Sequence, residues 1–330
     1  MPLILDVYFS SNKRQLYCSS EITEIRTSLC FNLFHEKKDI DFLLIGFSSL
    51  WVDFYNDLFE KLMLQNNNQK IISRTLATNH PGEDFIRVLY HDFSISKKSR
   101  FVFTSQPNRS TPYPHPYLHH VATFSDLKYL SLNIKPIELI RYYSLLSLRS
   151  FKNVISIITP FHEDLSKFKN IGGGSSLRKK AWLGKPFVAL EKQEKPISFF
   201  NIPKVFLTTV VDDKVIDNSL AEKISAFQQN ALLRFNEDVL RNGQIQGFLY
   251  FPLYLERREK KMIFKMHLEK FPKNTIVIGS PGEKLFENKT DEEIQEFFYN
   301  DNHMNFNGAV LFTTLMTPIL GQLIMDYKNE

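Results

Sequence analysis

The chain has 330 residues, of which 43% are hydrophobic, and this is enough apolar material for one large α/β domain or two smaller ones. Its 41 basic and 36 acidic residues are interspersed and give a formal net charge of +5. So small an excess of positive charge argues against nucleic acid as a partner.

At the N-terminus, no basic segment precedes the short apolar run, and no apolar run in the chain approaches the roughly 20 residues of a spanning helix. We therefore expect no signal peptide and no transmembrane segment, which by itself suggests a cytoplasmic protein. Cys18 and Cys30 lie twelve positions apart without a partner motif. We expect two ordinary thiols, and neither a disulfide nor a zinc site.

Short runs of β-branched and aromatic residues, each followed by turn residues and a helical pattern, predict the strands. They are residues 41–47, 69–76, 99–105, 154–160, 245–253 and 275–281. Such alternation predicts an α/β fold: a three-layer α/β/α sandwich with a central, mainly parallel sheet of about five strands. We expect residues 1–40 to be an N-terminal extension. Residues 41–330 would form a single domain, with an inserted loop region around residues 160–205.

Amphipathic periodicity predicts the principal helices at residues 51–65, 220–243 and 307–328. Gly243 is expected to end the second of them, as glycine commonly does. Pro318 lies within the third and is expected to kink it or to end its first half.

A serine follows the first predicted strand in the stretch "FLLIGFSSLWVDF" (residues 42–54). Ser48 is expected at the edge of the sheet and at the start of a helix, with its hydroxyl exposed and its backbone N–H free. Acyl-ester hydrolysis or transfer needs such a hydroxyl, a base, a carboxylate that orients the base, and N–H donors for the oxyanion. The alternative is that Ser48 only caps the helix.

Near the C-terminus, "YNDNHMNFNGAVLFT" (residues 299–313) places Asp301 and His303 two positions apart, directly before a helix. In an extended or turn segment, this spacing can bring the carboxylate to Nδ1 of the imidazole and leave Nε2 toward a serine. Ser48, His303 and Asp301 would then form a complete triad. Alternatively, both are polar residues of a solvated turn, with Asn305 or Asn307 as the helix cap.

These stretches resemble the SGNH (GDSL-type) hydrolase superfamily. "DNHMNFNGAVLFT" (301–313) and "TLATNHPGED" (75–84) are similar to bacterial SGNH-like proteins that act in O-acylation of cell-envelope polysaccharides. The likeness extends from about residue 41 to 325. It implies a serine esterase or O-acyltransferase that acts on acyl esters of a carbohydrate or cell-envelope glycan, with Ser48 as nucleophile, His303 as general base and Asp301 as its orienting carboxylate.

The resemblance also implies the oxyanion donors, which would be the N–H of Ser48, the side chain of Asn108, and a main-chain donor at His80 or Gly82. It further implies an acylated carbohydrate or small ester as substrate, a membrane-bound acyltransferase as partner and a location in the cell envelope. Phe47 stands where the G-D-S block carries aspartate. Because this removes hydrogen bonds that would brace the turn, a catalytically inactive carbohydrate-binding or scaffold protein of the same fold is a second hypothesis.

A third hypothesis is a metal-dependent nucleotide-sugar transferase, based on Asp212 and Asp213 after an apolar run, although an acidic loop explains them as well. Six histidines could in principle bind a metal, but adjacent histidines point in different directions and no carboxylate partner spacing supports them. They are residues 80, 91, 115, 119, 120 and 162. We therefore expect no metal and no cofactor.

Overall fold

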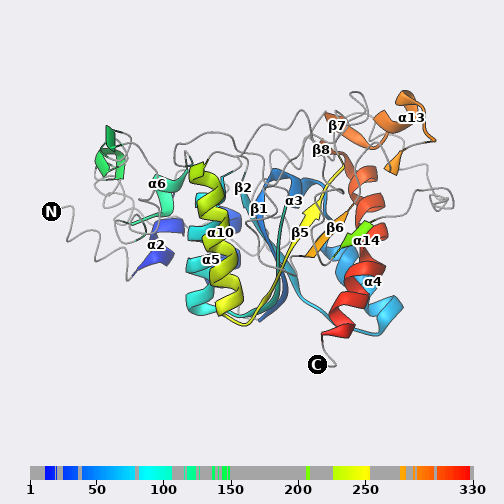
Figure 1. The fold of residues 1–330 in the computed structure, drawn as a ribbon, viewed down its shortest axis with the longest axis horizontal. Coiled ribbons are helices and arrows are strands. Elements are labelled where there is room, and N and C mark those ends of the chain that lie inside the picture. The colour runs from blue at the N-terminus through cyan, green and yellow to red at the C-terminus, as the bar shows by residue number, and fades with distance from the viewer. Residues whose placement is uncertain are drawn as a thin grey trace.

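The structure, a computed structural model, has a central sheet between two layers of helices (Figure 1). It describes residues 12–18, 20, 25–35, 39–78, 82–105, 115, 117–123, 126, 136, 137, 140, 143–146, 148, 206–208, 226–252, 276–279, 285, 286, 288–300 and 303–327. The predicted strand at 154–160, the predicted insert around 160–205, and Asp212 and Asp213 lie outside these residues.

The sheet has six strands in the order β2-β1-β3-β5-β6-β4. Its five parallel strands are β1 (Ile40–Phe47), β2 (Ser73–Thr78), β3 (Ser99–Ser105), β5 (Ile245–Tyr250) and β6 (Ile276–Gly279). The short strand β4 (Phe206–Thr208) pairs antiparallel with β6 at the edge. The predicted parallel sheet of about five strands is confirmed.

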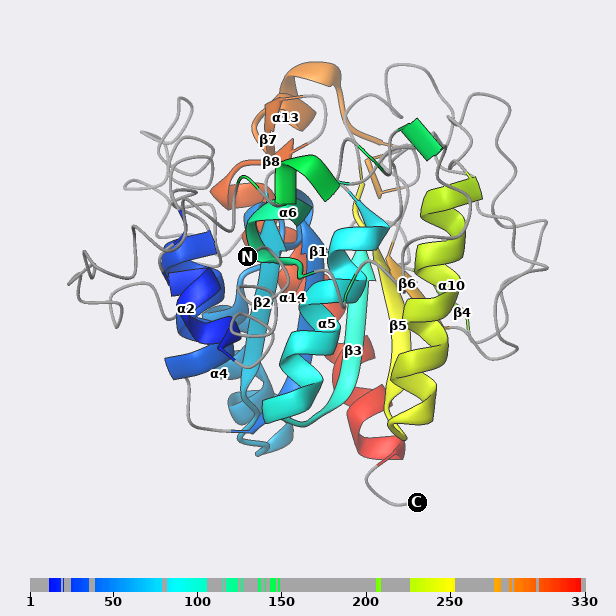
Figure 2. The same ribbon diagram turned by 90° about the vertical axis from the view of Figure 1, so that its left-hand side faces the viewer.

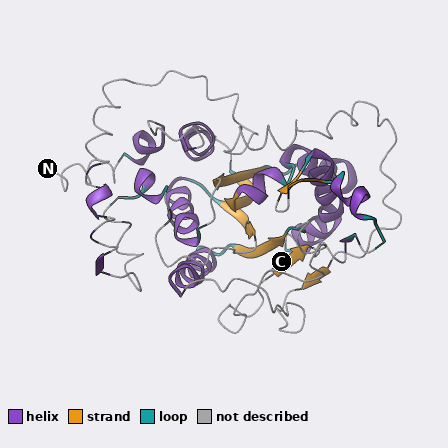
Figure 3. Cartoon of the chain, turned by 90° about the horizontal axis from the view of Figure 1, so that it is seen from above, coloured by secondary structure: helices purple, strands orange, loops and turns teal. Residues whose placement is uncertain are grey.

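Helices cover both faces of the sheet, so its strands are apolar on both sides (Figures 2 and 3). One face carries α5 (Glu83–Ser96) and α10 (Ala226–Arg241), together with α2 (Lys13–Cys18), the π-helical segments η1 (Ile25–Leu29) and η2 (Phe31–His35), and α6 (Leu118–Val121). The other face carries α4 (Asn56–Asn67) and α14 (Phe306–Asp326). This arrangement is the predicted three-layer sandwich.

The predicted helix at residues 51–65 is two helices, α3 (Ser48–Val52) and α4, with a break between them. At this break, residues between the two helices form hydrogen bonds with parts of the chain that are distant in sequence. The side chain of Asp53 binds the backbone of Met304, and the N–H of Tyr55 donates to the hydroxyl of Thr313 at 2.9 Å. These contacts satisfy the backbone outside a helix, which periodicity alone does not reveal.

The last helix, α14, runs without interruption through Pro318, so the expectation that its first half might end there is wrong. By length and composition α14 could also cross a membrane, whereas no transmembrane segment was expected from the sequence. In the fold, however, its apolar side chains pack in the same core as α4, and 61% of its most apolar window is buried. It is a core helix of this domain.

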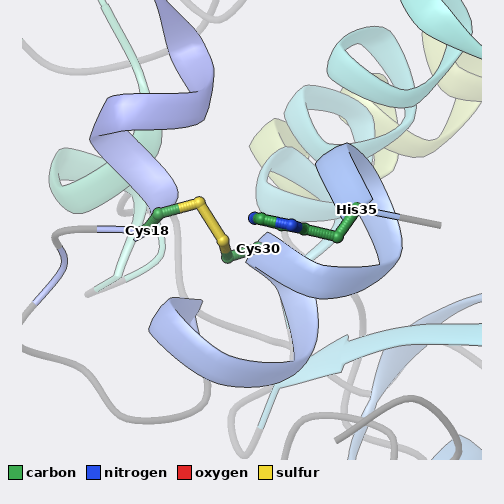
Figure 4. A group of neighbouring side chains, drawn as sticks. All are labelled: Cys18, Cys30 and His35. Carbon is green, nitrogen blue, oxygen red and sulfur yellow. A yellow bond between two sulfur atoms is a disulfide. The ribbon is translucent and has the colours of Figure 1, made fainter. Parts of the chain in front are cut away.

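The two cysteines form a disulfide, Cys18–Cys30, so the expectation of two free thiols is wrong (Figure 4). Cys18 ends α2, and Cys30 lies between η1 and η2, which pack back against α2 and bring the two Cα atoms within 5.1 Å. The imidazole of His35 lies beside the bridge in Figure 4. The sequence separation of 12 does not reveal this pairing, because it depends on how the helices pack.

Candidate active site

Ser48 is the first residue of α3, directly after β1, at the carboxyl edge of the sheet. Apolar anchors on both sides fix the turn, since the ring of Phe47 is buried in the core under α5 and the side chain of Leu50 in the core under α14. A Cβ at Gly46 would lie 2.7 Å from Cδ1 of Leu50, so a larger residue there would require the Leu50 side chain to move. Ser48 is only 7% exposed, so the expectation of an exposed serine is wrong.

His303 lies on the short strand β8 (His303–Met304), which pairs with β7 (Phe298–Asn300). Two anchors hold this hairpin. Asp53 Oδ1 accepts the backbone N–H of Met304 at 2.7 Å, which ties β8 to the end of α3. Asn305 is the N-cap of α14, with Oδ1 accepting the N–H of Gly308 at 3.1 Å and Nδ2 donating to the carbonyl of Glu296 at 2.7 Å.

These two segments bring Nε2 of His303 to 2.8 Å from Oγ of Ser48, although the residues are 255 positions apart. On the other side of the ring, Nδ1 lies 3.1 Å from Oδ1 of Asn300. An amide oxygen can only accept a hydrogen bond, so this pairing has Nδ1 donating its proton. Nε2 is then the acceptor that faces the serine hydroxyl, which is the tautomer that a general base requires.

The pKa of His303 is lowered to about 4, because burial disfavours the charged imidazolium. The imidazole is therefore neutral near pH 7 and can accept a proton. Asn300 orients the ring but carries no charge, so it does not offset this effect of burial on the pKa. The pair is thus an orientated serine–histidine dyad whose observed partner at Nδ1 is an amide.

A buried carboxylate lies behind the dyad. Asp53 is fully buried, its pKa is raised well above its usual range by burial, and within the described part of the chain its Oδ2 has no hydrogen-bond partner. Its role in the structure is to hold Met304, the neighbour of His303. The sequence did not identify Asp53 as a site residue, because it lies within the predicted helix at residues 51–65. It did not identify Asn300 either, although Asn300 lies only three positions before His303.

Of the predicted site residues, the structure brings Ser48 and His303 into contact. Asp301, Asn108 and His80 lie outside the described residues, so the triad carboxylate and two of the oxyanion donors stay predictions. Gly82 precedes α5 after β2, and a Cβ there would lie 2.6 Å from the ring of His115. The glycine therefore allows close packing beside the strand that neighbours β1.

Among the described residues, two groups of side chains have metal-ligating atoms within 4.8 Å of one another. In the group of Cys18, Cys30 and His35, the sulfurs are bonded to each other and are not thiolates. The second group is His91, Asp92 and Asp126. His119 and His120 on α6 were expected to point in different directions, but their ring centroids lie 4.1 Å apart, with an angle of 40° between the ring planes.

Comparison with known proteins finds no matching family model and no similar curated protein.

Proposed function

We propose that this chain is a serine esterase or O-acyltransferase of the SGNH type, and that it acts on acyl esters of a carbohydrate or cell-envelope glycan. One observation carries the proposal, namely the 2.8 Å contact between Ser48 Oγ and the acceptor nitrogen of His303 at the carboxyl edge of the sheet. A serine hydroxyl is a weak nucleophile unless a base at hydrogen-bond distance removes its proton as it attacks.

In the proposed reaction, Ser48 Oγ attacks the ester carbonyl carbon while His303 Nε2 takes the hydroxyl proton. The oxyanion that forms is stabilised by the backbone N–H of Ser48, which at the first position of α3 has no partner within the helix. Collapse of the intermediate expels the alcohol, which receives the proton from His303. Water or an acceptor hydroxyl then attacks the acyl carbon while His303 takes its proton, the bond to Ser48 Oγ breaks, and His303 returns the proton to Ser48.

The N–H of Ser48 is one donor, and the resemblance supplies Asn108 and a main-chain donor near His80 or Gly82 as the others. Asp301 stays in the proposal as the orienting carboxylate. The described contact at Nδ1 comes from Asn300, which can hold the ring in the reactive tautomer without stabilising its charge. The proposed substrate is an acylated glycan or small ester, with a membrane-bound acyltransferase as the proposed partner.

A second candidate function is a catalytically inactive, carbohydrate-binding or scaffold protein of the same fold. Two observations favour it: among the described residues the contact at Nδ1 of His303 comes from an amide, and Phe47 precedes Ser48. Neither an amide nor a phenyl ring adds the negative charge or the hydrogen bonds that would strengthen the nucleophile. The two candidates differ in whether Ser48 reacts.

A fluorophosphonate probe, which phosphonylates activated serines, separates them. The matched control is Ser49→Ala, because Ser49 lies on the same helix with the same 7% exposure as Ser48. For an enzyme, the probe labels Ser48 in the intact protein and in Ser49→Ala, but not in Ser48→Ala or His303→Ala. Peptide mass spectrometry locates the label. An unlabelled intact protein that still binds acetylated oligosaccharides would favour the binding protein.

If Ser48 is labelled, acetylated oligosaccharides and p-nitrophenyl acetate can be offered with and without a sugar acceptor. Release of acetate alone indicates an esterase, whereas acetyl transfer to the acceptor indicates an acyltransferase. Ser48→Ala should abolish both products.

A further inference from the structure

A buried ionic cluster lies on the other side of the sheet from α14, where α2 and α5 meet. The ammonium of Lys13 on α2 is 3.1 Å from Oδ2 of Asp92 and 2.7 Å from Oδ2 of Asp126. Tyr17 also donates to Asp92 Oδ2 at 2.7 Å. The side chains of both aspartates are at least 96% buried, so these charged groups lie inside the fold and away from solvent.

The two carboxylates use one oxygen each for these contacts. Lys13 and the donors beside it take the Oδ2 atoms, while the Oδ1 atoms face Nδ1 of His91, at 3.7 Å from Asp92 and 4.0 Å from Asp126. Both distances are too long for a hydrogen bond. Oδ1 of Asp92 is fully buried and has no hydrogen-bond partner among the residues that the structure describes. A buried carboxylate oxygen without a donor is costly and calls for a ligand.

The open side of this trio is a cavity of about 270 Å³ between α5 and α10. His91 and Asp126 line it, and Arg241 and Asn242 lie on its α10 side. The side chain of His91 is 46% exposed, so solutes reach it. The cavity can therefore admit an ion to the trio and supply it with water ligands.

We propose that Nδ1 of His91, Oδ1 of Asp92 and Oδ1 of Asp126 bind a divalent transition-metal ion, with Zn²⁺ as the representative ion. One imidazole and two carboxylates are a donor set that suits zinc, and three protein ligands with an open position completed by water is a common arrangement. Donors around a tetrahedral zinc at about 2.0–2.1 Å lie roughly 3.3 Å from one another. The two separations that involve His91, 3.7 and 4.0 Å, would shorten by less than about 1 Å to reach that geometry, and all three ligand atoms lie within 4.8 Å of one another.

The two carboxylates and the ammonium of Lys13 sum to one negative charge, which attracts a cation to these buried oxygens. Arg87 and Arg241, both paired with Asp238, line the same cavity and with it sum to one positive charge. Lys13 does not occupy the ligand positions, because it bonds the opposite oxygens. It orients the carboxylates from behind, as outer hydrogen-bond partners of metal ligands do. The competing structure is an ion-pair network in which a protonated His91 supplies the missing charge.

The test uses metal-free, untagged protein of full length and ZnCl₂ in isothermal titration calorimetry near pH 7.5. We expect one equivalent to bind to the intact chain. His91→Gln and Asp126→Asn should each weaken binding about tenfold or more. His119→Gln, a histidine substitution on the nearby helix α6, should leave it unchanged. No binding by the intact chain, or equal binding by His91→Gln, would overturn the proposal.

Because Asp126→Asn can disturb folding, a second measurement uses only the unaltered protein. Diethyl pyrocarbonate acylates accessible imidazoles, and mass spectrometry reports the rate at each histidine. Zinc should slow acylation of His91 about tenfold or more and leave His119 unaffected. Equal rates at His91 with and without zinc would contradict the site, whatever the variants do.

Discussion

Asp53 Oδ1 and the backbone N–H of Met304 are joined by a 2.7 Å hydrogen bond, which ties the segment that carries Ser48 to the one that carries His303. The carboxyl group is fully buried, and no described residue forms a hydrogen bond with its second oxygen. A residue that nothing in the sequence distinguishes therefore links the two segments that carry the dyad. Burial disfavours the charged form of Asp53. One substitution can therefore remove the charge while keeping the hydrogen bond to Met304, and another can remove the hydrogen bond.

Asp53→Asn should keep the acceptor for Met304 and remove the titrating group. Burial raises the pKa of Asp53, so the folded chain keeps a proton that the unfolded chain has released, in the window that begins at the ordinary value of 3.8 and extends upward. Stability contributed by Asp53 is thus lost as pH rises through that window. We expect Asp53→Asn to gain stability relative to the unaltered chain between pH 4 and pH 7, as measured by urea unfolding.

Asp53→Leu is the complementary change, since it removes the acceptor and leaves the N–H of Met304 buried without a partner. It should cost about 1–3 kcal/mol and reduce probe labelling of Ser48. Glu292→Gln, an exposed position on α13 (Asp291–Gln295), serves as the control for loss of a carboxylate. Labelling that is unchanged in Asp53→Leu would mean that Asp53 does not align the dyad.

The pH dependence of labelling follows from His303. Its pKa is lowered to about 4 by burial, so the neutral, base-competent form is present above about pH 4 and is lost as pH falls through that value. We expect the rate of fluorophosphonate labelling to fall on the acid side with a midpoint near pH 4. A midpoint near the ordinary histidine value of 6.5 would mean that a carboxylate compensates for the burial.

Asn300→Asp tests what a charge at Nδ1 would add. An anion within hydrogen-bond distance stabilises the imidazolium, and because Asn300 is exposed we expect the pKa of His303 to rise by about one unit. The acid limb of the labelling profile should move to higher pH by the same amount, and the plateau rate should increase. Asn66→Asp, on the exposed side of α4, is the control for an added surface charge. If the acid limb does not move, Asn300 has no role at the ring.

Asn305 offers a test of how the His303 hairpin is held. Asn305→Asp keeps the oxygen that caps α14 but loses the Nδ2 donor to Glu296, whereas Asn305→Ala loses both. Loss of the cap should cost about 0.5–2 kcal/mol, so stability should fall in the order Asn, Asp, Ala. Labelling of Ser48 should follow the same order, because the hairpin carries the base. An unchanged labelling rate in Asn305→Ala would separate the cap from the dyad.

Sequence alone predicted those parts of the structure that local patterns encode. The strand before Ser48 and the polar stretch around His303 are readable because a buried strand and a helix start each have a residue signature, and both side chains lie where these elements meet. The roles of Asp53 and Asn300 were not readable. One depends on a backbone group that is 251 positions away, and the other on the geometry of a two-stranded hairpin. The edge strand β4 has only three residues, which is too short for a periodicity.

The disulfide was also not predicted from the sequence, because the pairing depends on how the helices pack. Its contribution to the free energy of unfolding can be measured. Closing a loop of this length restricts the unfolded chain and stabilises the fold by about 3 kcal/mol. Cys18→Ser/Cys30→Ser should therefore unfold at a lower urea concentration than the unaltered chain, and dithiothreitol should reproduce that shift in the unaltered chain only. Since the bridge lies under α2 and η2, on the α5 side of the sheet, labelling of Ser48 at low urea should not change. A reductant that leaves the unaltered chain as stable as before would show that the bridge contributes nothing to folding.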